Sequence, residues 1–174
     1  PSVFFRAGGT IAVYLDTNGG KRGVTVTRSA TGNLSDMHIY QNAVILRHED
    51  ANPLLNSDLT TVDSSYDSDI PFTISSGNMI VDPETEAYIW TGKTYAPGGN
   101  ITLQSGGSGS AVDGRLYLAT SSVFTASGSQ AHSIGGGLYI GSSATFTAAN
   151  STVTFTATTT GKTIYAYQAA TLYD

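Results

Sequence analysis

The sequence predicts an all-β fold, built as a β-solenoid or β-helix-like stack of short strands. Three observations lead to this prediction. Runs of β-branched and aromatic residues recur along the chain, apolar residues rarely follow the helical period, and similar segments return at a regular spacing. In such a stack each turn of chain pairs with the next, about 4.8 Å away. The alternative is a β-sandwich or jelly roll, which could also donate a strand to a neighbour.

The predicted strands are short and are separated by turns rich in Gly, Asn, Ser and Asp, residues that favour chain reversals. Segment 152–157 alternates strictly. Val153, Phe155 and Ala157 face one way and threonines face the other, as in a strand with two different faces. In chain order, the predicted strands are 3–5, 10–15, 24–27, 43–46, 72–74, 79–81, 88–90, 101–103, 116–118 and 152–157.

A repeat in the C-terminal half is the main evidence for a stack. Residues 116–126 and 138–148 share Leu, Tyr, Ser, Phe, Thr and Ala at equivalent positions, with an offset of 138 − 116 = 22. The same step carries residues 92–95 onto 114–117. The sequence therefore predicts turns of about 22 residues.

Equivalent residues of successive turns lie one above the other in a stack, so side chains of one kind form ladders. The repeat predicts one ladder of tyrosines and one of phenylalanines, composed of Tyr95, Tyr117 and Tyr139, and of Phe124 and Phe146.

The repeat divides the chain into two regions. Residues 1–70 form an N-terminal β region with little repetition, and residues 71–174 form the β repeat region. The polar, acidic stretch 47–70 is predicted as a long loop between them. We expect the two regions to form one continuous structural unit.

The composition favours a secreted or cell-surface protein. Hydrophobic residues make up 40% and charged residues only 12%, with Ser, Thr, Gly and Asn in their place. The net charge of −5 argues against nucleic-acid binding, which needs a basic face. The absence of cysteine excludes disulfides and thiolate metal sites. No apolar run is long enough for membrane insertion, and because the chain starts at Pro1 we expect a removed signal peptide or a longer upstream region.

Segment 135–174 resembles the repeat regions of large bacterial and archaeal cell-surface proteins of the adhesin-like, β-solenoid kind. The resemblance is carried by the successive segments 136–140, 144–148, 151–156 and 161–164. It covers about a quarter of the chain closely. It implies an extracellular scaffold or adhesin-like role and brings no catalytic residues with it.

Three kinds of site can be proposed from the residues. Asp63, Asp67 and Asp69 are spaced so that a loop could offer their oxygens to a structural calcium ion, although a solvated acidic loop is the simpler interpretation. No other cofactor is expected. The three Asn-x-Ser/Thr sequons could carry glycans, and the aromatic residues, above all Trp90, could stack on sugars. The sequons begin at Asn33, Asn100 and Asn150.

No convincing catalytic set is present, so we expect that the protein is not an enzyme. A polysaccharide lyase or glycosidase would have to use Asp82, Glu84, Glu86 or Asp113. The preferred hypothesis is an extracellular structural protein, a subunit or segment of a filament, sheath or adhesin-like array that assembles with copies of itself or with neighbouring repeats through strand edges. A carbohydrate-binding, adhesive module is the first alternative, and the enzyme is the second.

Overall fold

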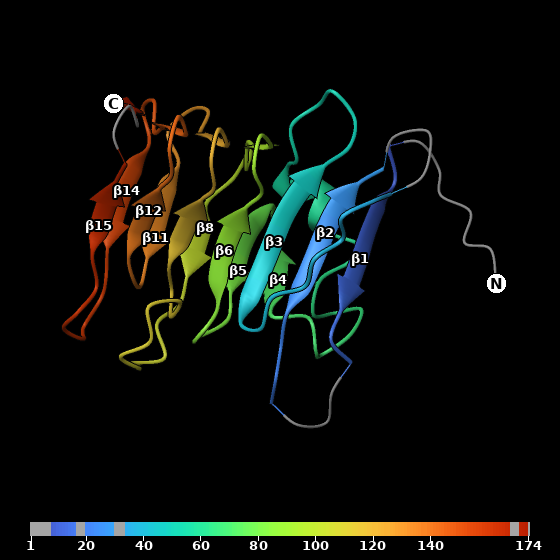
Figure 1. Ribbon diagram of the computed structural model, residues 1–174, viewed down its shortest axis with the longest axis horizontal. Helices are drawn as coiled ribbons and strands as arrows, with labels where there is room; N and C mark the ends of the chain where they lie inside the picture. Colours follow the sequence, from blue (N-terminus) through green and yellow to red (C-terminus); the bar gives the residue numbers. More distant parts are fainter. Residues whose placement is uncertain (1–7, 17–19, 30–33, 168–170, 174) are drawn as a thin grey trace.

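The computed structural model describes residues 8–16, 20–29, 34–167 and 171–173, and it is all-β as predicted (Figure 1). Within these residues the only helix is a short 3₁₀ helix, η1 (Asn56–Leu59). The strands form three sheets and follow one another along the long axis of the molecule, from β1 at one end to β14 and β15 at the other.

Each sheet collects every third strand of the repeat region. The seven-stranded sheet contains, in spatial order, β1 (Thr10–Tyr14), β2 (Val24–Arg28), β3 (Ala43–His48), β6 (Glu86–Ile89), β9 (Leu116–Leu118), β12 (Leu138–Ile140) and β15 (Ile164–Ala166). The four-stranded sheet contains β7 (Thr94–Tyr95), β10 (Val123–Thr125), β13 (Thr145–Thr147) and β16 (Thr171–Tyr173). The five-stranded sheet contains β4 (Phe72–Ser75), β5 (Asn78–Val81), β8 (Ile101–Leu103), β11 (Ala131–Ile134) and β14 (Thr152–Phe155).

From β5 onward, neighbouring strands within each sheet are parallel and in register. Tyr117 of β9 lies opposite Tyr139 of β12, a step of 139 − 117 = 22 residues. The same step separates Val123 from Thr145 in the second sheet. Residues that share a repeat position are therefore paired directly in these layers.

The predicted constant step is wrong elsewhere. Tyr88 lies opposite Tyr117, a step of 29 residues, and Tyr139 lies opposite Tyr165, a step of 26. Between β8 and β9 the chain makes a Gly- and Ser-rich loop, 105–113, and residues in such a loop need no partner in a sheet. Loop insertions therefore change the length of a turn without disturbing the pairing of its strands.

One hydrophobic cluster is shared by all three sheets. Alternate residues of each short strand point inward, so that Leu116 and Leu118 are buried while Tyr117 between them is half exposed. Phe124 of the second sheet and Leu103 of the third join the same cluster. The core thus runs along the length of the stack between the sheets.

The N-terminal end of the molecule is formed by antiparallel strands and a buried segment. β1 runs antiparallel to β2, and β4 folds back antiparallel on β5. The segment after β3 crosses the edge of β7, where Leu54 forms a bridge to Tyr95. Leu54, Leu59 and Ile70 are fully buried in this segment. The stretch predicted as a solvated loop over 47–70 therefore begins as the end of β3 and then contributes to the core.

The C-terminal end is different. β14, β15 and β16 each form the edge of their sheet, and among the described residues each pairs with one neighbour only. Their layer carries exposed apolar side chains, with exposed fractions of 40% for Phe155, 61% for Ile164 and 46% for Tyr165. The two ends of the stack therefore present chemically different surfaces.

Candidate functional site

Four tyrosines form a ladder on the outer face of the seven-stranded sheet. The ring centroids of Tyr88 and Tyr117 lie 4.7 Å apart, those of Tyr117 and Tyr139 4.3 Å, and those of Tyr139 and Tyr165 5.0 Å. The rings are nearly parallel, with interplanar angles of 7°, 5° and 15°. Both faces of Tyr117 and Tyr139 are therefore covered by other tyrosines.

The predicted placement of Tyr95 in this ladder is wrong. Tyr95 belongs to β7 in the second sheet and lies opposite Phe124. Tyr88 occupies the ladder position that was predicted for Tyr95, because loop 105–113 lengthens the intervening turn from 22 to 29 residues. The pattern apolar–Tyr–apolar could have located Tyr88, since Ala87-Tyr88-Ile89 matches Leu116-Tyr117-Leu118 better than Tyr95 does.

Phe124 and Phe146 face each other in the core, with ring centroids 4.8 Å apart and an interplanar angle of 8°. Tyr95 continues this buried column in a different geometry, meeting Phe124 edge-on at 6.1 Å. Burial raises the pKa of Tyr95 far above its ordinary value, and its hydroxyl donates to Asn56 Oδ1. This column is a packing feature and offers no surface to a ligand.

Aromatic and cationic groups also cover Trp90, the residue expected to stack on sugars. The His38 ring stacks on Trp90 with 5.2 Å between centroids and 19° between planes. The guanidinium carbon of Arg47 lies 5.8 Å from the Trp90 ring centroid, within the range of a cation–π interaction. Trp90 is thus engaged within the protein, and its stacking on a sugar is not favoured.

A buried ion pair lies beside the tyrosine ladder. The Nε of Arg115 donates to Glu86 Oε2 at 2.7 Å, and the ion pair closes to 2.5 Å at the Arg115 terminal nitrogen. Burial raises the pKa of Glu86, although Arg115 opposes the change. The Arg115 guanidinium also lies 4.9 Å from the Tyr117 ring. Burial and the neighbouring Tyr139 together raise the pKa of Tyr117 to about 12.

The acidic residues proposed as calcium ligands are used as hydrogen-bond acceptors. Asp63 Oδ1 accepts from the amide and hydroxyl of Ser65, and Asp63 Oδ2 accepts from the amide of Ile74 at 2.7 Å. Burial alone would raise the pKa of Asp63, but these hydrogen bonds outweigh it and lower the pKa. Asp67 accepts from the Tyr14 hydroxyl and the Asp69 amide.

Across residues 8–16, 20–29, 34–167 and 171–173, no three His, Cys, Asp or Glu side chains are grouped so that they could hold a metal ion. The calcium site stays a prediction, and the hydrogen bonds to Asp63 and Asp67 weigh against it.

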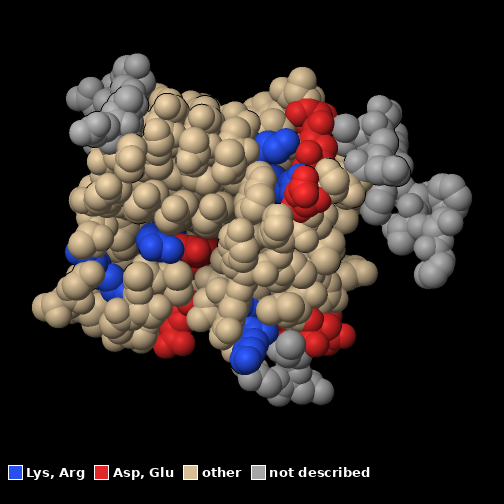
Figure 2. All heavy atoms as spheres, in the orientation of Figure 1, with Lys and Arg blue, Asp and Glu red and all other residues tan. Residues whose placement is uncertain are grey.

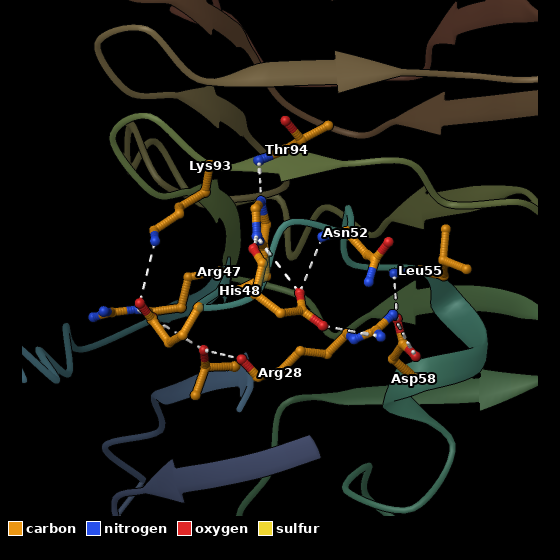
Figure 3. A network of polar contacts seen from close by, with 11 residues as sticks. Arg28, Arg47, His48, Asn52, Leu55, Asp58, Lys93 and Thr94 are labelled. Atoms are coloured by element: carbon orange, nitrogen blue, oxygen red, sulfur yellow. Dashed lines mark hydrogen bonds and ion pairs between the residues drawn. The ribbon is translucent and has the colours of Figure 1, made fainter. Parts of the chain in front are cut away.

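A network of ion pairs fastens the segment after β3 to the strands beneath it (Figure 3). Arg28 of β2 pairs with Asp50 at 3.1 Å and with Asp58 at 3.3 Å. Glu49 accepts from Arg47 at 2.6 Å and from Lys93 at 3.2 Å. These contacts make a structural clamp at the N-terminal end of the stack.

His48 completes this network through its ring nitrogens. Its Nε2 accepts from the amide of Thr94 at 2.9 Å, so its Nδ1 is the protonated nitrogen that donates to the carbonyl of Asp50 at 2.8 Å. His48 is thus placed as a structural link and not as a catalytic base.

The view in Figure 2 shows a mostly uncharged surface on which acidic and basic side chains adjoin in small groups. Most of the carboxylates considered for catalysis have partners of their own inside the protein or at its surface. Asp113 is fully buried and accepts from the amides of Gly106 and Glu84. Asp82 pairs with Arg22 at 2.5 Å. Asp82, Glu86 and Asp113 are thus engaged in internal contacts, whereas the Glu84 side chain is exposed.

The three sequons differ in placement. Asn33 lies outside the described residues. Asn100 is half-buried immediately before β8, and its Oδ1 accepts from the Ala131 amide at 2.8 Å. Asn150 is exposed in the turn between β13 and β14.

Comparisons with protein-family models, curated proteins and solved structures found no match. The resemblance to cell-surface repeat proteins therefore stays a prediction. Within the described residues, no helix has the length and apolar character needed to cross a membrane.

Proposed function

We propose that this chain is an extracellular structural protein, a β-solenoid segment of a cell-surface filament, sheath or adhesin-like array. Its layers extend through the strand edges of the C-terminal end, where further β layers add in parallel register. The observation that supports this most directly is the coincidence of three one-sided strand edges with exposed apolar side chains in a single layer.

The hydrogen bonds of β15 indicate how another strand would add. The Leu138 amide donates to the Thr163 carbonyl, and the Tyr167 amide donates to the Ile140 carbonyl. In a parallel pair, alternate residues bond to the same neighbour, so the amides of Ile164 and Ala166 point toward the outer edge. These are the groups that an added strand would pair with.

The N-terminal end is built differently from the C-terminal layer, which favours one direction of assembly. Antiparallel β1 and the β4–β5 hairpin stand at that end, and the buried segment around Leu54 and Leu59 covers the edge of β7. Natural solenoids need capping elements of this kind, because an uncovered core would associate with other molecules. β1 and β4 also pair with one neighbour each in the described residues, so they are the strand edges that the C-terminal layer of another copy would meet in a head-to-tail array.

The low charge content supports an extracellular setting, as it did from the sequence. The ladder geometry supports a mechanical role, since each added layer would gain backbone hydrogen bonds and a stacked aromatic ring together. No bound group is needed for either contribution.

Sedimentation velocity and negative-stain microscopy over a range of concentrations test this proposal. We expect wild-type protein to form oligomers or filaments, and the variants Ile164→Lys and Ala166→Pro to remain monomeric. The lysine places a charge on the edge, and the proline removes an outward-pointing amide without breaking a bond to β12.

Tyr66→Lys is the matched control, because Tyr66 is 73% exposed and lies in the acidic segment, away from the edge. It adds the same charge and should assemble like the wild type. A wild-type chain that stays monomeric at the highest concentration would show that the strand edges do not drive assembly.

A further inference from the structure

A shallow groove of about 330 Å³ lies beside the tyrosine ladder. Its lining comes from four successive layers, those of β6, β9, β12 and β15, so it extends along the stack and not around it. With layers about 4.8 Å apart, three steps give the groove a length of about 14 Å. This shape suits an elongated ligand lying parallel to the long axis.

The groove exists because small residues replace aromatic ones in the middle layers. The amides of Trp90, Ala119, Gly141 and Tyr167 donate to the preceding layer in the same way, so these four residues occupy equivalent positions. Large rings stand at the first and last position, while Ala119 and Gly141 stand between them. These four residues form a second column beside the tyrosine ladder, and this column has no aromatic ring in its two middle layers.

Gly141 keeps this gap open. A Cβ at Gly141 would lie 2.8 Å from the Leu118 carbonyl oxygen and 3.0 Å from the Ala119 carbonyl carbon, which are backbone atoms that cannot turn aside. A larger residue at this position would therefore have to shift the backbone of the preceding layer.

The groove lining carries hydroxyl groups and aromatic rings but no charged side chain. Thr120 and Ser142 follow the two small residues, and Tyr117 and Tyr139 also line the groove. Such a surface gives no charge to pair with an acidic or basic ligand. It matches a ligand that is uncharged, rich in hydroxyls and apolar on its ring faces.

Tyr167 supplies the aromatic surface. The faces of Tyr117 and Tyr139 are covered within the ladder, whereas Tyr167 is 48% exposed and stacks on no other ring in the described part of the chain. A sugar ring resting its apolar C–H face on Tyr167 would be guided along the groove by the hydroxyls of Ser142 and Thr120.

We propose that this groove binds a short stretch of a neutral, linear polysaccharide, lying along the stack axis with one sugar ring against Tyr167. A peptide is the less suitable occupant. The groove is lined by the outward tyrosines of β6, β9 and β12 and by residues that follow the strands, whereas extended peptides pair with the free backbone of a strand edge. The groove would give a structural filament a lateral attachment to a glycan matrix.

Isothermal titration calorimetry with a panel of linear oligosaccharides tests the proposal. The neutral members are β-1,4-glucan, β-1,4-xylan, β-1,4-mannan and α-1,4-glucan oligomers, and an oligogalacturonate is the charged member. We expect saturable binding of at least one neutral oligomer. Tyr167→Ala should weaken that binding by about tenfold or more, and Thr120→Trp, which fills the groove from an exposed position, should abolish it.

Tyr66→Ala is the matched control, since it removes an exposed tyrosine far from the groove and should leave affinity unchanged. Amide chemical shifts of Gly141 and Ser142 should move on binding. The proposal is overturned if no neutral oligomer binds at about 10 mM, if only the charged oligomer binds, or if both groove variants bind like the wild type. Strand-edge assembly is measured separately, by the sedimentation of Ile164→Lys and Ala166→Pro, so a groove that binds no neutral oligomer does not by itself contradict it.

Discussion

The ammonium group of Lys162 lies 3.3 Å from Oδ2 of Asp113, although the two residues belong to different layers of the stack. Lys162 also donates to the backbone carbonyls of Ser108 at 3.1 Å and Ser110 at 2.8 Å. Asp113 in turn accepts from the Ser105 hydroxyl at 2.9 Å. A single lysine thus fixes the Gly- and Ser-rich loop to the segment that leads into the edge strand β15.

Lys162→Met should destabilise the protein strongly. The Lys162 side chain is 7% exposed and that of Asp113 is fully buried, so removing the ammonium leaves a buried carboxylate without its cation. Breaking such a pair from one side costs about 3–5 kcal/mol. Urea unfolding followed by circular dichroism measures the loss.

Lys93→Met provides the comparison for Lys162→Met. Lys93 pairs with Glu49, but their side chains keep exposed fractions of 23% and 20%, so water can solvate the remaining carboxylate. The loss of stability should be clearly smaller for Lys93→Met. Equal losses for the two variants would show that burial of the Lys162–Asp113 pair contributes nothing special.

The sequence predicted the ladder where the repeat was undisturbed and missed it where a loop intervened. Tyr117 and Tyr139 are one 22-residue step apart with no insertion between them, so their pairing could be read directly. Tyr95 was assigned to the same ladder because the step was taken as constant. The seven extra residues of the 29-residue turn shift the register, so a constant step fails there and only the local apolar–Tyr–apolar pattern at Tyr88 indicates the correct partner.

The contacts between distant polar residues were out of reach of sequence analysis. Lys162 and Asp113 share no motif, and their meeting depends on the lengths of two intervening turns. Asp63 was considered a metal ligand because its spacing suits one, but spacing does not reveal that its oxygens already accept from Ser65 and Ile74. The sequence thus shows which polar residue types are present, whereas the contact partners of those residues depend on the fold.

Alkaline solution should destabilise the protein through the tyrosine ladder. The pKa of Tyr117 is raised from 10.0 to about 12, first by burial and then by the charge and hydrogen bond of Tyr139. The folded state therefore holds this proton more tightly than the unfolded state does. The resulting stability is complete below pH 10 and is lost as the pH rises through about 12.

Tyr117→Phe isolates this effect, because phenylalanine keeps the stacked ring and removes the titrating hydroxyl. Urea unfolding at a series of alkaline pH values should show a shallower decline for the variant than for the wild type. Tyr66→Phe, at an exposed position away from the ladder, should decline like the wild type. Identical curves for all three proteins would contradict a role of Tyr117 ionisation.

Mild acid should destabilise the protein through His132. This histidine is 2% exposed, its Nδ1 accepts from the Ile101 amide at 3.2 Å, and its Nε2 is buried without a partner in the described residues. Burial lowers its pKa below 6.5. The unfolded state therefore binds the proton first, and stability falls as the pH drops below 6.5 toward the folded pKa.

His132→Gln should flatten this part of the pH profile, since glutamine offers an acceptor to the Ile101 amide and does not titrate. A proton NMR titration of the His132 ring in the wild type gives an independent reading. A midpoint at or above 6.5 would contradict the burial argument, whatever the stability curves show.

Expression in a host that glycosylates Asn-x-Ser/Thr sequons should place a glycan on Asn150 and leave Asn100 unmodified. Asn150 lies exposed in a turn, where an enzyme can reach its side chain amide. Asn100 instead enters β8, which pairs with β5 on one side and β11 on the other, and its side chain accepts from Ala131. Glycopeptide mass spectrometry distinguishes the two sites, with Thr152→Ala expected to abolish the modification and Thr102→Ala expected to have no effect on it. A glycan found on Asn100 with Asn150 bare would mean that the modifying enzyme meets the chain before β8 is incorporated, so that burial in the finished stack does not decide which sequon is used.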